Sequence, residues 1–281
     1  MRLADLVHLV RAPAALSVPG DVVAGAAAAR VLDRRTAALA GASVCLYWAG
    51  MAANDWADRE RDATERPERP IPSGRVSPGT AVGVAVGLTA AGVALAGRAA
   101  GRRGLAVAVP LVGAIWAYDL WAKNTAAGPA LMASCRALDV LLGASTGNAR
   151  AALPAAAAVG IHTYTVTALS RREVTGGRPG LAAATLATTA GLAGAVAAGA
   201  PAAAVTRTLA GAYAVGYGRA QARILGDATA PRVRAAVAAG IVGLPTLQGA
   251  LASRAGSVRA GLAVAAAAPL ARLLARRVSP T

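Results

Sequence analysis

One acidic segment holds the residues that are best suited to chemistry. Six of the 13 aspartates and glutamates lie in the stretch NDWADRERDATERPERPIPSGR, which starts at residue 54. Asp55, Asp58 and Asp62 have the spacing i, i+3, i+7, which places three carboxylates on one face if the preceding helix continues through them. Asn54 adds a carbonyl oxygen to that face. Hard oxygen ligands of this kind are typical of a Mg²⁺ site that also contacts a substrate phosphate.

Arginines of the same segment, Arg61 and Arg69 among them, are candidate ligands for phosphate oxygens, which guanidinium groups bind in a bidentate manner. The alternative is a mixed-charge loop that only keeps a connector hydrated. Acids are scarce elsewhere in the chain, and here three are in register at the end of an apolar stretch. The sequence therefore favours a site for a cation and a phosphate over a solvated loop.

The rest of the chain predicts the membrane helices that position this segment. Apolar residues make up 56 % of the 281 residues, charged residues 15 %, and the mean hydropathy is +0.51, whereas soluble domains are about a quarter charged. The acidic segment follows the second apolar stretch. We predict an all-α polytopic membrane bundle of nine or ten transmembrane helices, with spans near residues 12–30, 37–53, 79–98, 104–121, 126–148, 152–169, 180–199, 201–218, 234–252 and 257–275.

The net charge of +16 has a membrane explanation. A soluble chain this basic would suggest nucleic acid, but there is no Phe and aromatic residues total 3 %, so side chains that stack on bases are few and we expect no nucleic-acid partner. Arginines in short loops orient membrane helices and contact anionic lipid headgroups. A cytoplasmic N-terminus gives about two basic residues inside for each one outside. This predicts a multi-pass protein of the cell or inner membrane, with the acidic segment facing the cytoplasm.

Some charged residues fall inside the predicted spans, where a lone charge is costly. Arg136 and Asp139 are three residues apart, so they form either a neutralising pair on one helix face or the wall of a substrate cavity. Asp21 is a candidate partner for Arg207, or a cavity residue. Asp119 is a candidate for a further metal ligand or for an acid/base group.

The acidic segment resembles the first aspartate-rich motif of the UbiA superfamily of intramembrane prenyltransferases. That motif, N-D-x-x-D-x-x-x-D, is intact from Asn54 to Asp62, follows the second span as in the family, and is trailed by the similar RPIPSGRVS. The similarity in span order covers most of the chain and implies a single domain over residues 1–281. Within the superfamily the chain is most similar to the EboC-type branch, through YDLWAKN, CRALDVLLGAS and SRREVTGG.

The resemblance implies about nine helices around a central cavity open to lipid, capped by cytoplasmic loops that bind Mg²⁺ and a prenyl diphosphate. In such a site the metal and basic residues stabilise the leaving diphosphate, and an acceptor captures the allylic cation. We therefore expect Mg²⁺-dependent transfer of a prenyl group to an acceptor of unidentified structure, with Asp55, Asp58 and Asp62 at the reaction centre and with no obligatory protein partner.

Two further positions are carried over from the family. Tyr118 and Lys123 resemble its tyrosine–lysine element after the fourth span, where the lysine is a phosphate ligand, although the spacing is one residue longer here; the alternative is an interfacial anchor. The second aspartate motif, D-x-x-x-D after the sixth span, is absent. Its place holds Arg171, Arg172 and Glu173. In one interpretation the two arginines contact the diphosphate and Glu173 is a candidate ligand of a second metal ion. In the other, the three residues belong to a cytoplasmic loop without a role in binding. One or two Mg²⁺ ions are both compatible with this sequence.

Three other functions stay open at this point. A terpene cyclase, which needs no acceptor, or another lipid-phosphate transferase, which transfers to a sugar or polyol, would use the same fold. A CDP-alcohol phosphotransferase also places aspartates at a membrane surface, but its D-G-x-x-A-R opening is missing. A non-enzymatic transporter would be expected to place its polar residues midway across the bilayer.

Overall fold

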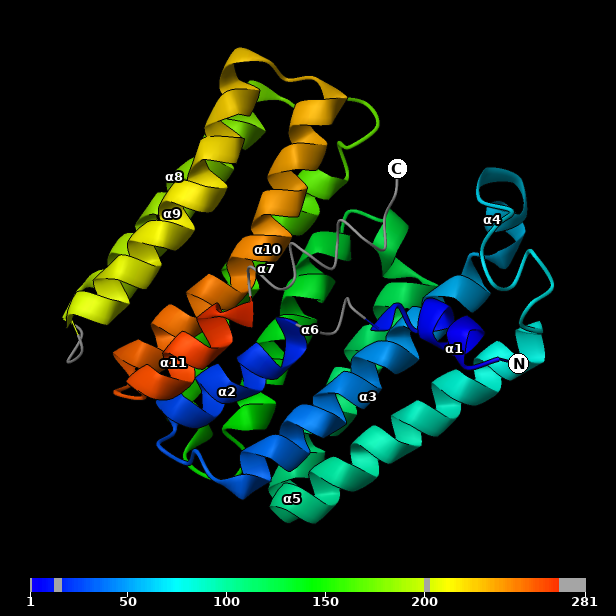
Figure 1. Cartoon of the computed structure of the whole chain (residues 1–281), viewed down its shortest axis with the longest axis horizontal. Helices are drawn as coiled ribbons and strands as arrows, with labels where there is room; N and C mark the ends of the chain where they lie inside the picture. Colours follow the sequence, from blue (N-terminus) through cyan, green and yellow to red (C-terminus); the bar gives the residue numbers. More distant parts are fainter. Residues whose placement is uncertain (1, 13–16, 200–202, 268–281) are drawn as a thin grey trace.

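The described part of the chain is helical throughout, as the sequence predicts. The computed structural model describes residues 2–12, 17–199 and 203–267, which contain no strand. Its α-helices (Figure 1) are α1 (Leu3–Leu9), α2 (Val18–Ala28), α3 (Arg34–Ala57), α4 (Arg59–Glu65), α5 (Pro78–Leu120), α6 (Gly128–Gly143), α7 (Leu153–Ser170), α8 (Pro179–Ala197), α9 (Ala203–Gly226), α10 (Ala230–Arg254) and α11 (Val258–Ala265). Two 3₁₀ turns, η2 (Ala122–Asn124) and η3 (Ala149–Ala152), precede α6 and α7.

The long element α5 is a hairpin of two antiparallel helices. Gly101, at its tip, has φ 58° and ψ −141°, a backbone conformation that glycine adopts without steric cost. The two halves pack closely, because a Cβ added at Gly104 would lie 2.4 Å from the carbonyl oxygen of Ala96. Near the other end, Trp116 Nε1 donates to Thr89 Oγ1 at 3.3 Å. The two spans predicted at 79–98 and 104–121 are therefore both present, joined by one glycine instead of a loop.

The helices alternate in direction, so the bundle has two distinct ends (Figure 1). We call one the aspartate end: there α3 and the second half of α5 finish, and α6, α8 and α10 begin. We call the other the arginine end: it consists of residues 29–35, 98–104, 144–152 and 254–259. Elements far apart in sequence thus meet at each end.

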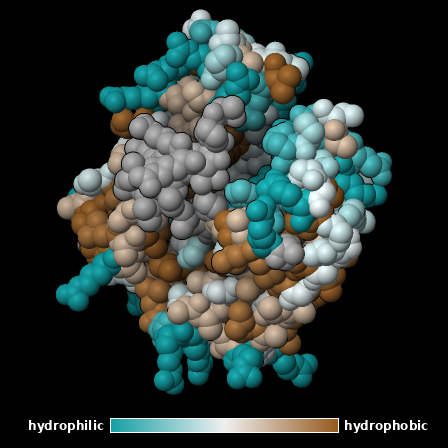
Figure 2. Space-filling model, turned by 45° about the vertical axis from the view of Figure 1, so that its right-hand side comes forward, coloured by the Kyte–Doolittle hydropathy of each residue, from teal (hydrophilic) through white to brown (hydrophobic). Residues whose placement is uncertain are grey.

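The surface and the helix lengths indicate an integral membrane protein. Figure 2 shows hydrophilic residues gathered at opposite ends of the molecule, with apolar surface between them. Among the described helices, α3, α5, η3 with α7, α8 and α10 are long and apolar enough to cross a membrane, and the hairpin α5 contributes two spans. α2 is a shorter apolar helix of 11 residues. The number nine or ten is thus not confirmed, and the last predicted span, 257–275, extends past the described residues.

Glycines let α2 and α6 cross with their backbones in contact. A Cβ added at Gly25 would lie 1.8 Å from the carbonyl oxygen of Val140, and one at Gly143 would lie 2.0 Å from that of Val22. Small residues at crossings of this kind are typical of membrane helices, where close van der Waals packing drives association. This crossing fixes the register of α2 against α6, and with it the position of the charged residues that both helices carry.

Candidate active site

The acidic segment begins where α3 ends. The spacing places the three aspartates on one face if one helix continues through them, but α3 stops at Ala57 and α4 starts at Arg59. Asp58 lies between them with φ −87° and ψ 0°, so the chain bends there instead of continuing straight. Backbone hydrogen bonds still pass through the bend, from Asp58 N to Asn54 O at 2.9 Å and from Asp62 N to Asp58 O at 2.8 Å. The carboxylates consequently divide into two groups.

The first group joins Asp55 and Asp62 through one shared arginine, Arg69. Both carboxylates are buried. Arg69, from the loop after α4, donates to Asp62 Oδ2 and lies 3.4 Å from Asp55 Oδ1. Arg11, from the segment after α1, donates to Asp55 Oδ1 at 2.6 Å. Asp62 Oδ1 is buried without a hydrogen-bond partner, so this group keeps one oxygen available for a ligand.

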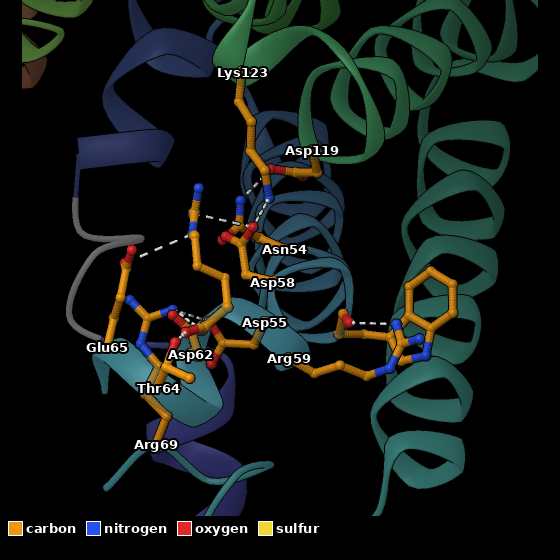
Figure 3. A network of polar contacts seen from close by, with 12 residues as sticks. Asn54, Asp55, Asp58, Arg59, Asp62, Thr64, Glu65, Arg69, Asp119 and Lys123 are labelled. Atoms are coloured by element: carbon orange, nitrogen blue, oxygen red, sulfur yellow. Dashed lines mark hydrogen bonds and ion pairs between the residues drawn. The ribbon is translucent and has the colours of Figure 1, made fainter. Parts of the chain in front are cut away.

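The second group is centred on Asp58. Lys123 Nζ lies 2.8 Å from Asp58 Oδ1, and Arg61 Nη2 lies 3.2 Å from the same oxygen. The Asp58 and Lys123 side chains are only 11 % and 12 % exposed, and they point toward each other in Figure 3. η2 supplies the lysine by turning the chain immediately after α5. Two of the candidate site residues, Lys123 and Asp58, are therefore in direct contact in the structure.

Asn54 and Asp119 form a third contact beside these groups. Asn54 Nδ2 donates to Asp119 Oδ1 at 3.1 Å (Figure 3), and Asp119 is buried near the end of α5. Gly50 permits the two helices to come this close, because a Cβ there would lie 2.7 Å from Ile115 Cγ2 and 3.0 Å from Asp119 Oδ2. Asn54 thus points its amide group at a fourth acid, while Tyr118, one residue before that acid, is half-buried.

The metal-ligand set expected from the motif is not assembled in this conformation. Among residues 2–12, 17–199 and 203–267, no three His, Cys, Asp or Glu side chains are grouped so as to hold a metal ion. The physical reason is visible in the contacts: basic side chains lie between the carboxylates and form ion pairs with them. The donor chemistry itself, carboxylate and amide oxygens, is the kind that Mg²⁺ prefers.

The α7–α8 loop reaches the same end of the bundle through Arg171. Its guanidinium donates to the carbonyl oxygen of Thr125, immediately after η2. Arg172 and Glu173 are half-buried. Burial raises the pKa of the Glu173 carboxyl, and the charge of Arg234 offsets part of that rise. Arg171 therefore lies near the Lys123 turn, whereas the structure gives no contact between Glu173 and the aspartate motif.

Arg136 and Asp139 do not form the neutralising pair that their spacing suggested. Arg136 Nε lies 2.7 Å from Asp21 Oδ2, in α2, with both side chains buried, and its guanidinium stacks 5.3 Å from the centroid of the Tyr47 ring. Asp139 Oδ1 instead accepts a hydrogen bond from Ser43. Asp21, for which Arg207 was a candidate partner, pairs with Arg136 instead, since the α2–α6 crossing presents it to that side chain.

These contacts continue the polar site into the bundle along one face of α3. Ser43, Tyr47, Gly50, Asn54 and Asp58 follow one another at intervals of three or four residues, the spacing of one helix face. The partners of the four residues with functional side chains are, in the same order, Asp139, Arg136, Asp119 and Lys123, while Gly50 leaves room for Asp119 beside α3. We call these five residues, four in α3 and Asp58 directly after it, together with their partners the polar column. It leads from the aspartate motif toward the middle of the bundle.

A match over most of the chain decides the family. The model of the "UbiA prenyltransferase family" matches residues 16–276, which include the aspartate motif, Lys123 and the α7–α8 loop. The chain belongs to the UbiA prenyltransferase family. The resemblance drawn from the motif N-D-x-x-D-x-x-x-D is thereby confirmed, and the polar column is a feature of a UbiA-family bundle.

Relatives of this UbiA-family chain carry two kinds of name. Two are called "Digeranylgeranylglyceryl phosphate synthase": that of Methanothrix thermoacetophila is 44 % identical over 30 % of each chain, and that of Methanopyrus kandleri 47 % over 28 % of each. The "Bacteriochlorophyll synthase 33 kDa chain" of Cereibacter sphaeroides is 39 % identical over 34 % of this chain and 32 % of its own. The matched region thus spans about a third of these relatives.

Solved structures agree on the fold over nearly the whole chain. The "Apo structure of a UbiA homolog from Aeropyrum pernix K1" has a TM-score of 0.67 and 19 % identity, covering 84 % of this chain and 96 % of that one. The structure from "Structural and mechanistic insights into the biosynthesis of Digeranylgeranylglyceryl phosphate synthase in membranes" has a TM-score of 0.64 and 14 % identity, covering 92 % and 99 %. At these identities the likeness concerns the fold alone.

Sequence reasoning missed one contact of the motif and one contact inside the bundle. Arg11 was not singled out as a site residue, yet it contacts Asp55 from 44 residues away. Its φ of 45° is rare for a residue with a side chain and is a strain of the kind that often accompanies function. Asp21 contacts Arg136, which was not among its candidate partners. The available sequence signal for Arg11 was its position as a basic residue after a short N-terminal helix. The sequence separation between Arg11 and Asp55 gives no indication that the two side chains are in contact.

Proposed function

We propose that this protein transfers a prenyl group from a prenyl diphosphate to an acceptor, in a Mg²⁺-dependent reaction at the aspartate end. Membership in the UbiA prenyltransferase family supports the reaction class. The observation that carries the proposal for this chain is the interleaving of acids and bases at one end of an apolar bundle. A site for a metal diphosphate needs both signs of charge at close range, since the cation and the anion are bound together.

The basic side chains are placed to bind the diphosphate oxygens. Lys123, Arg69 and Arg11 each contact a carboxylate of the motif, and Arg61 is a fourth such base. A diphosphate that enters with a divalent cation offers these donors oxygen atoms in place of the carboxylates. Arg171 adds a guanidinium from the α7–α8 loop, with Arg172 beside it. Tyr118 adjoins Asp119 and is a further candidate for contact with the donor.

The oxygen atoms of Asp55, Asp58, Asp62 and Asn54 would hold Mg²⁺. The unpartnered, buried Oδ1 of Asp62 supports this assignment, because a carboxylate oxygen without a donor is costly unless a ligand satisfies it. When bound, the metal takes up negative charge as the diphosphate leaves. Glu173 is the candidate for a second ion, with half-burial at the same end of the bundle as its support.

The polar column is the proposed path for the polar part of the acceptor. Asp139 Oδ2 and the Tyr47 hydroxyl are both buried without a hydrogen-bond partner, so each can bind a group that reaches the middle of the bundle. The positive charge of Arg136 is neutralised by Asp21. Arg136 can therefore orient a ligand without being an unpaired charge in the membrane. The isoprenoid tail would lie against the Ala- and Gly-rich helices, within reach of membrane lipid.

The aspartate end is proposed to face the cytoplasm. The supporting observation is the distribution of basic residues, which are about twice as numerous in the loops on that side as on the other.

Pyrophosphate release tests the reaction directly. Purified protein in lipid nanodiscs is given prenyl diphosphates of several chain lengths, with Mg²⁺ or with a chelator. We expect release only with the metal, and a loss of about a hundredfold or more in Asp58→Asn, because the leaving group is stabilised electrostatically. Glu60→Gln is the matched control, because Glu60 is in the same segment but its side chain is 87 % exposed and contacts only Arg59. Unchanged release in Asp58→Asn would overturn the site.

The same assay separates transfer from cyclisation. The two relatives' names indicate different products, so the acceptor is sought by adding lipid extracts and following a prenylated product. Release that requires such an extract supports transfer. Release at full rate without any acceptor, together with a cyclic hydrocarbon product, would identify a terpene cyclase instead.

A further inference from the structure

A second charged site lies at the arginine end, opposite the proposed active site. A pocket of about 310 Å³ opens between the start of α3, the tip of the α5 hairpin and the segment after α6. Its polar lining consists of Arg35, Arg98, Arg103, Ser145 and Thr146, and Gly101 forms part of its wall. Two elements, α3 and the α5 hairpin, thus bring three arginines to one pocket, and the segment after α6 adds the two hydroxyl residues.

Positive charge in this pocket is not neutralised by the protein. Within the described residues, Arg35, Arg98 and Arg103 take part in no ion pair, in contrast to the arginines of the aspartate motif. The one acid nearby in sequence, Asp33, is already used: its carboxylate accepts from the backbone N–H of Arg35 at 2.7 Å and of Thr36 at 3.3 Å and so caps α3. Like charges that share a pocket repel one another, and an anion between them removes that cost.

The hairpin tip sets the geometry of this pocket. Gly101, with its positive φ, reverses the chain within one residue, so Arg98 and Arg103 reach the same cavity from the two halves of α5. Ala99 and Ala100 are the other tip residues in the lining, and their small side chains leave room in the pocket. Arginines that line one pocket can offer their planar guanidinium groups to the oxygen atoms of one phosphate.

The surroundings favour a lipid as the source of that phosphate. The pocket lies at the arginine end, and the apolar second half of α5 begins beside it. On the second half of α5, Leu105 and Val109 follow the hairpin tip and are 36 % and 57 % exposed. An acyl chain can therefore lie along α5 while its headgroup stays at the level of the arginines.

We propose that Arg35, Arg98 and Arg103 bind the phosphate of an anionic phospholipid at the end of the bundle opposite the active site. This site is separate from the diphosphate site: it contains no residue of the aspartate motif, and it faces the other leaflet. It does not depend on the proposed function, so either proposal can fail alone.

Lipid retention measured by native mass spectrometry tests the site. The full chain is released from micelles that contain phosphatidylglycerol or phosphatidylcholine, and bound lipid is counted for wild type and for Arg98→Gln and Arg103→Gln. We expect wild type to retain phosphatidylglycerol preferentially, and each variant to lose affinity by about tenfold, the effect of one charge-assisted hydrogen bond of about 1.4 kcal/mol.

The neighbouring Arg102 and Arg34 provide matched controls, since Arg102→Gln and Arg34→Gln remove the same charge from residues outside the lining. Equal losses in the controls and in the pocket variants, or equal retention of the two lipids by wild type, would overturn the proposal. An arm with inorganic phosphate separates the two sources of the anion: stabilisation by phosphate alone, with no effect of phosphatidylglycerol, would overturn the lipid as occupant. Circular dichroism confirms that each variant is folded before it is scored.

Discussion

Arginines at the two ends of the bundle have opposite surroundings. At the aspartate end, Arg11, Arg61 and Arg69 each lie within ion-pair distance of a carboxylate. At the arginine end, nine arginines accompany a single acid, Asp33, whose carboxylate caps a helix. One residue type therefore serves two purposes. An arginine that is paired with a carboxylate can exchange that partner for the diphosphate when a metal diphosphate binds. An arginine without an acidic partner at a membrane surface instead attracts anions from outside the protein.

Removing a base should have the largest effect at the aspartate end. We expect Lys123→Met to lower the rate of pyrophosphate release by about a hundredfold to a thousandfold, because the change removes a donor to the diphosphate and leaves Asp58 without its nearest cation. Arg102→Gln removes a base from the arginine end and should leave the rate unchanged. If both variants lost activity equally, the distinction between the two ends would not hold.

Between the two ends, the buried pair of Asp21 and Arg136 should matter for stability. We expect Arg136→Met to lower the free energy of unfolding in detergent by about 3–5 kcal/mol, because it strands a buried carboxylate without its cation. The double variant Asp21→Asn/Arg136→Met should recover part of that loss. Arg150→Met, at an exposed position of the arginine end, should change stability by less than about 0.5 kcal/mol. A single Arg136→Met variant as stable as wild type would show that the pair is not formed.

The smallest effect concerns Glu173, an acid of the aspartate end outside the ion pairs of the motif. Its pKa is raised by burial, so the folded protein holds the proton more tightly than the unfolded chain does. The stability that this carboxyl contributes is present below its usual pKa and is lost as the pH rises through the folded-state pKa. We expect Glu173→Gln to raise the thermal midpoint slightly at about pH 7 and not at about pH 4. The opposite pH dependence would mean that the carboxylate is stabilised by a base.

Much of the fold was predictable because it depends on local sequence. Hydropathy located the helical stretches, and both halves of the α5 hairpin fall on predicted spans. The hairpin itself was not predicted, since Gly101 is one of 32 glycines and only its positive φ distinguishes it. The condition for a shared face of Asp55, Asp58 and Asp62, one helix that continues straight through them, could not be judged from the sequence for a related reason. A bend of one residue at Asp58 leaves the spacing unchanged but sends the carboxylates to different partners.

By itself, the sequence determined the features that arise between residues close together in the chain: the apolar helices, the order of the motif residues and the membership in a family. The tertiary structure alone decided which charges meet. Arg11 contacts Asp55 across 44 residues, Lys123 contacts Asp58 from the far side of the hairpin, and Arg136 contacts Asp21 because two glycines bring α2 onto α6. The physical reason is that Coulombic pairing depends on distance in space, which helix crossings set and sequence spacing does not.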